Sequence, residues 1–336
     1  MRSCNPGSFS CRALRLAATL LACAALPRLI AAPIPHGSVE LVAEHPSLAA
    51  GQTLSVGLQF KLEPGWHIYW RNPGDSGEPP SVNWQLPVGL TAGELQWPTP
   101  RRLGTSSVVD FGYEDAVMLL APIHADANLP VREPAQLGAT VRVLVCREVC
   151  IPGKAQLSLT LPVKSSWPAA RDARPGGPFA AARQSLPRPF PASWRLRATA
   201  TNDAFILTAR LGRPITQATF FPLEESELDN AAPQKLQPSA AGFRLTLRKS
   251  KQLLKPLGRL KGVLVFDADR GDAPWPGYLI DVPVSQSVAG RNSPARVSRA
   301  VTVSRSSSGW SETRDNVVVL ASSPAPGRIS CSRVNF

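Results

Sequence analysis

The sequence has few of the residues on which most enzyme chemistry depends. It contains only four histidines, no two of them at the spacing of a metal-binding pair. It also lacks a G-x-S-x-G nucleophile elbow, a phosphate loop rich in glycine and lysine, and a paired zinc-ligand motif. These absences argue against hydrolases and nucleotide-dependent enzymes, and the sequence predicts no cofactor and no bound metal.

Long hydrophobic runs are also missing after residue 33, where nothing approaches the roughly 18 apolar residues of a membrane-spanning helix. Before it, three arginines precede an apolar run at 16–26, which is typical of a secretory signal and too short to cross a bilayer. Residues 1–32 therefore predict an exported chain that is soluble once the signal is removed. A lipoprotein anchor at Cys23 is the alternative.

Acidic residues are scarce at both ends, and this produces most of the net charge of +13. Residues 1–32 hold four arginines and no acid, and residues 286–336 hold seven arginines and two acids. The body between them has an ordinary balance and no basic stripe with interleaved aromatic residues. We therefore expect no nucleic-acid partner.

Cysteine is limited to six positions, three of which lie in the predicted signal. The close spacing of Cys146 and Cys150 assigns them to each other as a disulfide in an oxidising compartment, and leaves Cys331 as a spare. Four steps of extended strand cover about 13 Å, whereas bridged Cα atoms lie within about 7 Å, so the chain must bend between them. A ring this small adds only about 2 kcal/mol of stability, which makes the pair a better candidate for redox exchange than for a structural staple.

Short alternating segments, separated by turns rich in proline and glycine, predict an all-β fold of two immunoglobulin-like β-sandwich domains in tandem. The segment between them is dense in proline, glycine, alanine and arginine and lacks periodicity. The second domain contains no cysteine and no histidine, so we expect it to bind or to space. The predicted parts are a signal at 1–32, a redox domain at 33–165, a linker at 166–191, a second sandwich at 192–285 and a disordered tail at 286–336.

Several motifs, in order, resemble the periplasmic N-terminal region of the DsbD-like thiol:disulfide interchange proteins, and most closely the branch called suppressor of copper sensitivity protein B. The motifs lie at Gly65–Gly77, Trp97–Pro100, Phe111–Glu114 and Cys146–Pro152. The resemblance implies an immunoglobulin-like domain in the periplasm whose cysteine pair takes electrons from a thioredoxin-like domain. It implies periplasmic proteins that carry disulfides as the acceptors, and it links the chain to cytochrome c-type biogenesis and copper tolerance.

In that family a multi-helix membrane segment follows the N-terminal region, and here a tail rich in serine and arginine takes its place. Either a separate membrane partner supplies electrons, or the chain is a truncated or frame-altered version of a longer protein. We favour the second explanation because of the composition of the tail.

Alternating residues on both sides of the cysteines place the pair at a hairpin tip, where a thiolate can reach a sulfur in line. Such a small ring is expected to be strained, and therefore easily reduced. Arg147 could lower a thiol pKa and Glu148 raise it, although both could also be solvated tip residues.

The resemblance implies that an aromatic cap covers the disulfide, with Phe111 and Tyr113 at the corresponding place, while ordinary core packing is the alternative. Asp110 and Glu114 are expected to be loop charges. The leading hypothesis is a thiol:disulfide exchange module with Cys146 and Cys150 as its reacting residues, which would make the chain a protein-disulfide reductase component. The alternative is a non-catalytic β-sandwich adaptor whose disulfide only shapes a loop.

Overall fold

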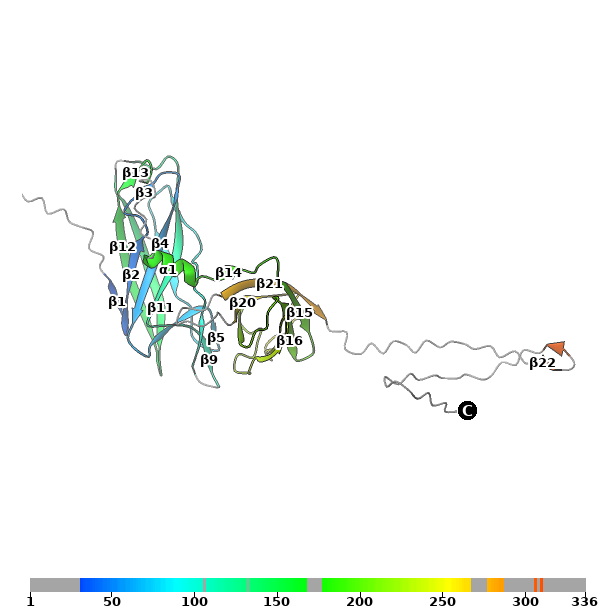
Figure 1. The fold of residues 1–336 in the computed structure, drawn as a ribbon. Helices are drawn as coiled ribbons and strands as arrows, with labels where there is room; N and C mark the ends of the chain where they lie inside the picture. The colour runs from blue at the N-terminus through cyan, green and yellow to red at the C-terminus, as the bar shows by residue number, and fades with distance from the viewer. Residues whose placement is uncertain are drawn as a thin grey trace, which may run out of the picture. The chain divides into compact units, whose positions relative to one another are not determined.

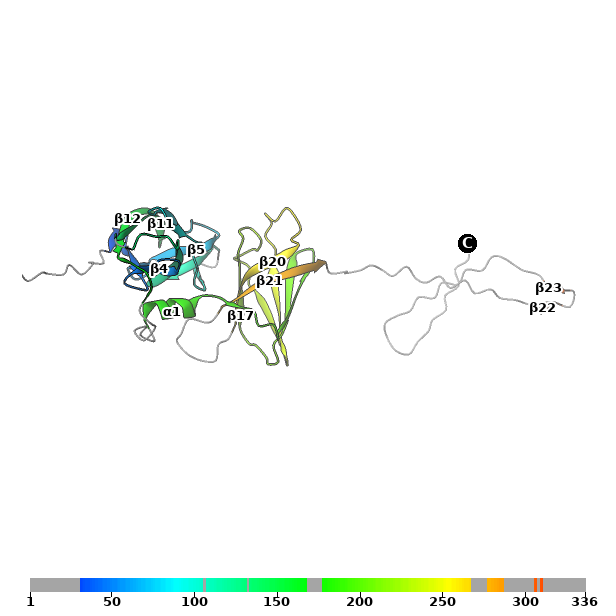
Figure 2. The ribbon, with the colours of Figure 1, turned by 90° about the horizontal axis from the view of Figure 1, so that it is seen from above.

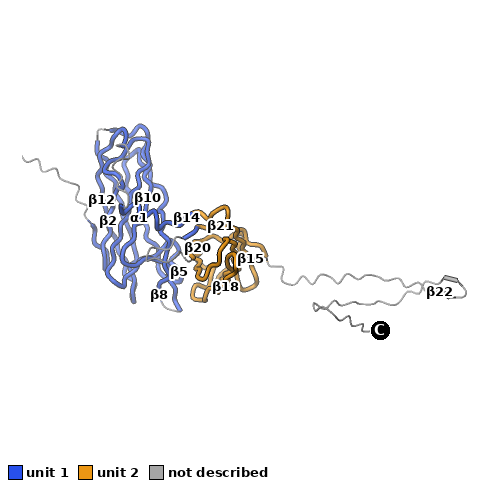
Figure 3. Tube along the Cα trace, viewed as in Figure 1, with its two compact units in different colours: residues 1–188, 268–278 blue, residues 189–267, 279–336 orange. Residues whose placement is uncertain are grey.

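The computed structural model describes residues 31–104, 107–131, 133–167, 177–266, 277–286, 305–306 and 309–310. The chain divides into two compact units (Figure 3), unit 1 from residues 1–188 and 268–278, and unit 2 from 189–267 and 279–336. The prediction of an all-β fold is confirmed, since strands dominate both units (Figure 1). Residues 1–30 of the predicted signal peptide, Cys331 and nearly all of the predicted tail lie outside the described residues, while Ala32 at the end of the predicted signal begins β1.

Unit 1 is a sandwich of two mainly antiparallel sheets. One sheet has the strand order β1-β2-β4-β10-β7, and the other has the order β12-β11-β5-β9-β8 with β6 paired to β11. A short parallel pair joins β13 to β3. The strands are β1 (Ala32–Ile34), β2 (Gly37–Ala43), β3 (Leu48–Ala49), β4 (Thr53–Leu62), β5 (His67–Gly74), β6 (Ser81–Gln85), β7 (Leu90–Ala92), β8 (Arg101–Gly104), β9 (Val109–Glu114), β10 (Ala116–Ala125), β11 (Ala135–Cys146), β12 (Cys150–Leu161) and β13 (Val163–Lys164).

The core of unit 1 follows directly from two-residue alternation. On β4, Leu54, Val56, Leu58 and Phe60 are all fully buried, while the polar residues between them are at least partly exposed. The same pattern continues along β11 through Leu137 and Val141. Because successive side chains on a strand point to opposite faces, each sheet presents one apolar face to the other. Figure 2, seen from above, shows the strands of unit 1 end-on, with the two sheets facing each other.

A short helix lies within 166–191, where the sequence predicted a linker. Helix α1 (Pro178–Ser185) begins with proline in its first turn, a position that tolerates the missing N–H. Its Phe179 and Ala182 are buried against Met118 and Leu120 of β10, and Arg183 forms an ion pair with Glu44. Eight residues are too few to display a helical period, so only the packing against β10 reveals the element.

Unit 2 is built on one eight-stranded sheet of order β17-β20-β21-β15-β16-β19-β18, with β14 paired to β21. The ring of Phe243 on β19 lies 6.0 Å from that of Phe266 on β20, although three strands separate β19 from β20 in the sheet. The sheet therefore curls over itself to bury its apolar face. The strands are β14 (Arg188–Pro189), β15 (Arg195–Ala200), β16 (Ala204–Arg210), β17 (Ala218–Pro222), β18 (Lys235–Ser239), β19 (Gly242–Arg248), β20 (Arg259–Phe266) and β21 (Gly277–Gln286), and the short pair β22 (Arg305–Ser306) and β23 (Gly309–Trp310) lies further along the chain.

Candidate functional site

The two close cysteines lie at the tip of the β11–β12 hairpin, as the alternating flanks predicted. The strands are in continuous register from Ala135 opposite Leu161 to Cys146 opposite Cys150. The two cysteines are bonded, and their Cα atoms are 4.2 Å apart. Three residues turn the chain between them, and the N–H of Arg147 donates to the carbonyl of Val149. The expected bend is therefore a tight hairpin turn closed by the disulfide.

The two half-cystines differ strongly in exposure. Cys146 is only 2% exposed, whereas Cys150 is an exposed residue. The cause is strand order, because β11 pairs with both β12 and β5, while β12 is the edge of the sheet. Of the two, Cys150 is the half-cystine that solvent or another protein can approach.

A row of directly opposite residues extends from the disulfide across the sheet. Cys146 pairs with His67 on β5, and His67 pairs with Glu114 on β9. Directly opposite residues in antiparallel strands project from the same face, with Cβ atoms about 5 Å apart. Tyr69, two residues after His67, shares that face, and its ring lies 5.3 Å from the imidazole.

Tyr69 contacts the disulfide itself. Its hydroxyl oxygen lies 3.5 Å from Cys150 Sγ. A disulfide sulfur carries no hydrogen, so in this state the phenol is the donor and the sulfur the acceptor. Tyr69 is fully buried, and Gly77, at φ +79°, lies over its ring so closely that a Cβ there would be 2.1 Å from Cζ. The phenol is therefore held in place by the loop that follows β5.

A buried carboxylate supports the same loop. Asp110 Oδ1 accepts hydrogen bonds from the Ser76 hydroxyl at 2.9 Å and from the Ser76 N–H at 3.1 Å. The Ser76 side chain also lies beside the Tyr69 phenol, whose pKa it lowers in part. Asp110 is 6% exposed and lies on β9, so the expectation that it is a loop charge is wrong. Glu114 likewise ends β9 and does not lie in a loop.

Burial sets the protonation of these groups. Burial raises the pKa of the Tyr69 phenol, and the nearby Asp110 carboxylate raises it as well. The Ser76 side chain lowers this pKa in part. Burial also raises the pKa of Asp110, against the hydrogen bond from Ser76 and the proximity of His67, which lower it. Burial lowers the pKa of His67, and among the described residues its Nε2 has no hydrogen-bond partner. The disulfide therefore lies beside a neutral phenol and a largely neutral imidazole.

The two residues expected to cap the disulfide are part of the core. Phe111 is 1% exposed and meets the ring of Trp70 edge to face at 6.5 Å. Tyr113 is buried and donates its hydroxyl to the carbonyl of Pro98 at 2.7 Å, and burial raises its pKa well above the usual value. Alternation along β9 directs both to the face opposite Glu114. Their role as a cap stays a prediction.

Arg147 and Glu148, the expected pKa modulators, occupy the exposed turn. The Arg147 guanidinium carbon lies 5.1 Å from the ring centre of Trp66, and His36 stacks on the same indole at 3.7 Å. The contact holds the hairpin turn against the Gly65–Trp66 turn. An effect of either residue on a cysteine pKa stays a prediction.

No three His, Cys, Asp or Glu side chains cluster as a metal site in the part of the chain that the structure describes. The same part contains no helix that is both long and apolar enough to cross a membrane.

The fold and the site define a class of protein, an immunoglobulin-like β-sandwich with a disulfide at a hairpin tip. Residues 38–162 match the family model described as "Thiol:disulfide interchange protein DsbD, N-terminal". Unit 1 therefore contains a domain of the DsbD N-terminal family, as the motifs predicted. No curated protein matches the chain.

One of the solved structures that are similar to the chain shares its fold. The chain is similar to the N-terminal periplasmic domain of ScsB from Proteus mirabilis, with 19% identity, a TM-score of 0.53, and coverage of 74% of this chain and 94% of that one. A protein of unknown function from Porphyromonas gingivalis W83 matches at 11% identity and a TM-score of 0.22, covering 73% of this chain and 99% of that one. The TM-score of the first shows that the two chains share a fold.

Proposed function

We propose that unit 1 is a thiol:disulfide exchange module that passes electrons from a thioredoxin-like donor to proteins carrying disulfides, with Cys146 and Cys150 as its reacting residues. One observation carries the proposal: the more exposed half-cystine is also the one whose sulfur accepts a hydrogen bond from a buried phenol. A disulfide that only shaped a loop would need neither exposure nor a donor at its sulfur.

The accessible sulfur determines the order of bond changes. A donor thiolate attacks Cys150 Sγ, the bond to Cys146 breaks, and its electron pair and a proton go to Cys146 Sγ. The second donor thiol then attacks the donor sulfur of this mixed disulfide, so the donor leaves oxidised and Cys150 is released as a thiol. Two electrons and two protons reach the chain, and the reverse sequence delivers them to a substrate disulfide.

Tyr69 stabilises the Cys150 thiolate in this scheme. A hydrogen bond from the phenol favours the charged form of the sulfur and so lowers its pKa. Asp110 fixes Ser76 through two hydrogen bonds, and Ser76 lies beside the phenol, so the two residues help to position it. Cys150 is then the attacking thiol toward substrates, and Cys146 resolves the mixed disulfide.

The periplasm is the compartment that fits this chemistry, because disulfides form and persist in oxidising compartments. The family match and the periplasmic domain of P. mirabilis ScsB support this placement. The partners we propose are a thioredoxin-like donor domain, periplasmic proteins with disulfides, and a membrane protein that supplies electrons.

The test mixes a reduced thioredoxin-like protein with the oxidised chain. Electron transfer is measured as the loss of the donor's free thiols. We expect stoichiometric oxidation of the donor, and none with the variant Cys146→Ser/Cys150→Ser. A pull-down with the same double variant examines the adaptor alternative. If wild-type chain leaves the donor reduced, and the double variant still retains an envelope partner, the exchange function is wrong.

A further inference from the structure

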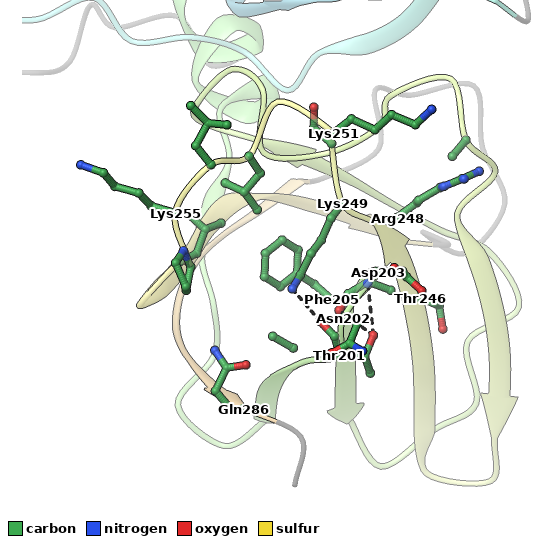
Figure 4. A pocket seen from close by; sticks show the side chains of 18 of the residues that line it. Thr201, Asn202, Asp203, Phe205, Thr246, Arg248, Lys249, Lys251, Lys255 and Gln286 are labelled. Atoms are coloured by element: carbon green, nitrogen blue, oxygen red, sulfur yellow. Dashed lines mark hydrogen bonds between the residues drawn. The ribbon is translucent and has the colours of Figure 1, made fainter. Parts of the chain in front are cut away.

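Unit 2 carries an open pocket with a basic rim (Figure 4). The pocket has a volume of about 970 Å³ and lies between the start of β16 and the loop 249–258, which joins β19 to β20. Five cationic side chains line it: Lys235, Arg248, Lys249, Lys251 and Lys255. Among the described residues that line the pocket, Asp203 is the one acid. The pocket therefore has the charge of a site for an anionic partner.

The cations differ in how firmly they are held. Lys249 donates to the carbonyl of Thr201 at 2.6 Å, and its ammonium lies 4.9 Å from the ring centre of Phe205. These contacts fix Lys249 as part of the pocket wall. Arg248 is paired with Asp229 at 3.6 Å. Lys251 and Lys255 are exposed, and neither forms an ion pair within the described part of the chain. These two lysines can meet an external anion without breaking a contact.

An exposed leucine lies between the two rim lysines. The side chain of Leu254 is 91% exposed, and Leu253 and Leu257 beside it line the pocket. The loop has a defined conformation, because the Leu253 N–H donates to the Ser250 carbonyl at 3.2 Å and Ser226 Oγ donates to Gln252 Oε1 at 2.9 Å. The fold thus holds a large apolar side chain in water next to two cations.

We propose that loop 249–258 docks unit 2 on an anionic lipid surface, with Leu254 entering the interface and Lys251 and Lys255 contacting phosphate headgroups. Exposed apolar side chains flanked by lysines are typical of protein segments that lie in the headgroup region. Charge complementarity alone also fits a small soluble anion, but such a ligand gives no role to an exposed leucine. Leu254 is the feature that selects the lipid surface.

Vesicle binding by the full chain tests the lysines. Each lysine close to an anionic surface contributes about fivefold in partitioning, so Lys251→Gln/Lys255→Gln should weaken binding to vesicles of phosphatidylglycerol and phosphatidylcholine by about thirtyfold. The matched control is Arg142→Gln/Lys154→Gln, which removes two exposed charges from opposed positions on β11 and β12. It should change binding by less than about twofold. The arginines after residue 285 are present in every variant.

A second pair tests the apolar contact. Leu254→Ser should weaken vesicle binding by about tenfold and leave binding to soluble polyaspartate unchanged, while Val88→Ser, at a valine that is 98% exposed on unit 1, should change neither. Equal losses of vesicle binding in Lys251→Gln/Lys255→Gln and in Arg142→Gln/Lys154→Gln would overturn the proposal, because the attraction would be general. Binding of polyaspartate but not of vesicles would overturn it in favour of a soluble anionic partner, and vesicle binding unaffected by Leu254→Ser would also contradict it.

Discussion

The hydroxyl of Tyr69 lies 3.5 Å from Cys150 Sγ, and this contact joins two segments 81 residues apart in the sequence. Tyr69 is fully buried, and Cys150 lies on the exposed edge strand. A rigid donor therefore faces the sulfur that a partner can reach. In the proposed mechanism this relationship makes Cys150 the sulfur that attacks and is attacked.

Replacing Tyr69 by phenylalanine should slow exchange without unfolding the domain. A hydrogen bond to a charged group contributes about 1.5–3 kcal/mol, so Tyr69→Phe should reduce the rate of reaction with an oxidised test disulfide by at least about tenfold. The measurement is the second-order rate constant of the reduced chain with that disulfide.

The control for Tyr69→Phe is Tyr113→Phe, since the Tyr113 hydroxyl donates to the carbonyl of Pro98 in the core. This variant should lower the free energy of unfolding by about 1–3 kcal/mol, because a buried carbonyl loses its donor, and leave the rate of exchange unchanged. Equal effects of the two variants on rate would show that Tyr69 acts only through stability.

Single cysteine variants should differ in reactivity. In Cys146→Ser the thiol left at the hairpin tip is the exposed Cys150, and in Cys150→Ser it is Cys146, which is 2% exposed. Every other cysteine is the same in both variants. We expect iodoacetamide to alkylate Cys146→Ser about tenfold faster than Cys150→Ser. This ratio of rates corresponds to burial of the Cys146 thiol adding on the order of 1.4 kcal/mol to the activation barrier. Faster alkylation of Cys146 would reverse the proposed order of attack.

The pH dependence of exchange should report Asp110, whose pKa is raised mainly by burial. As the pH falls through this pKa the carboxylate gains a proton, accepts less strongly from Ser76, and positions Tyr69 less well. In the pH–rate profile, the exchange rate should then show a second decrease, in addition to the decrease caused by protonation of the thiolate. In Asp110→Asn we expect that second decrease to vanish, and its persistence would assign it to another group.

Unit 2 contains a second buried carboxylate, with a consequence for stability. The pKa of Glu227 is raised to about 7, mainly by burial and also by the nearby Glu224, while Lys261 acts to lower it. Glu227 is 6% exposed, and no hydrogen bond to its Oε2 is present among the described residues. The folded state therefore holds the proton more tightly than the unfolded state, so Glu227 destabilises the fold progressively as pH rises from about 4.5 to 7.

Glu227→Gln should accordingly raise the melting temperature at pH 8 by much more than at pH 4.5. The full effect on the free energy of unfolding is on the order of 3 kcal/mol. Thermal unfolding of the variant at both pH values measures it, and Glu225→Gln, at the exposed neighbouring residue, provides the control. A stabilisation that is the same at both pH values would contradict the assignment.

Alternation and turn residues were enough to predict the all-β fold and the hairpin, because both are properties of neighbouring residues. The partners of the disulfide were not predictable in this way. Tyr69 contacts Cys150, and Ser76 binds Asp110 nearby, from segments far apart in the sequence that β5 and β9 bring together through a register shift between Tyr69 and Gly74. That shift depends on tertiary packing, and the sequence alone gave no reason to separate Asp110 from an ordinary loop charge.

The helix α1 (Pro178–Ser185) shows the same limit. Its composition is that of a linker, and its helical state depends on the burial of Phe179 against β10. Local propensity was therefore a weak guide where a long-range contact decides the structure.

The reduction potential of the Cys146–Cys150 disulfide tests the central claim most directly. The full chain is equilibrated with glutathione buffers of known ratio, and the dithiol and disulfide forms are separated after acid quenching. The exchange function predicts a reversible equilibrium at a potential above about −300 mV, in the range of disulfides that glutathione-like donors can reduce. A bond that stays oxidised in buffers below about −300 mV, like a structural disulfide, would contradict the account.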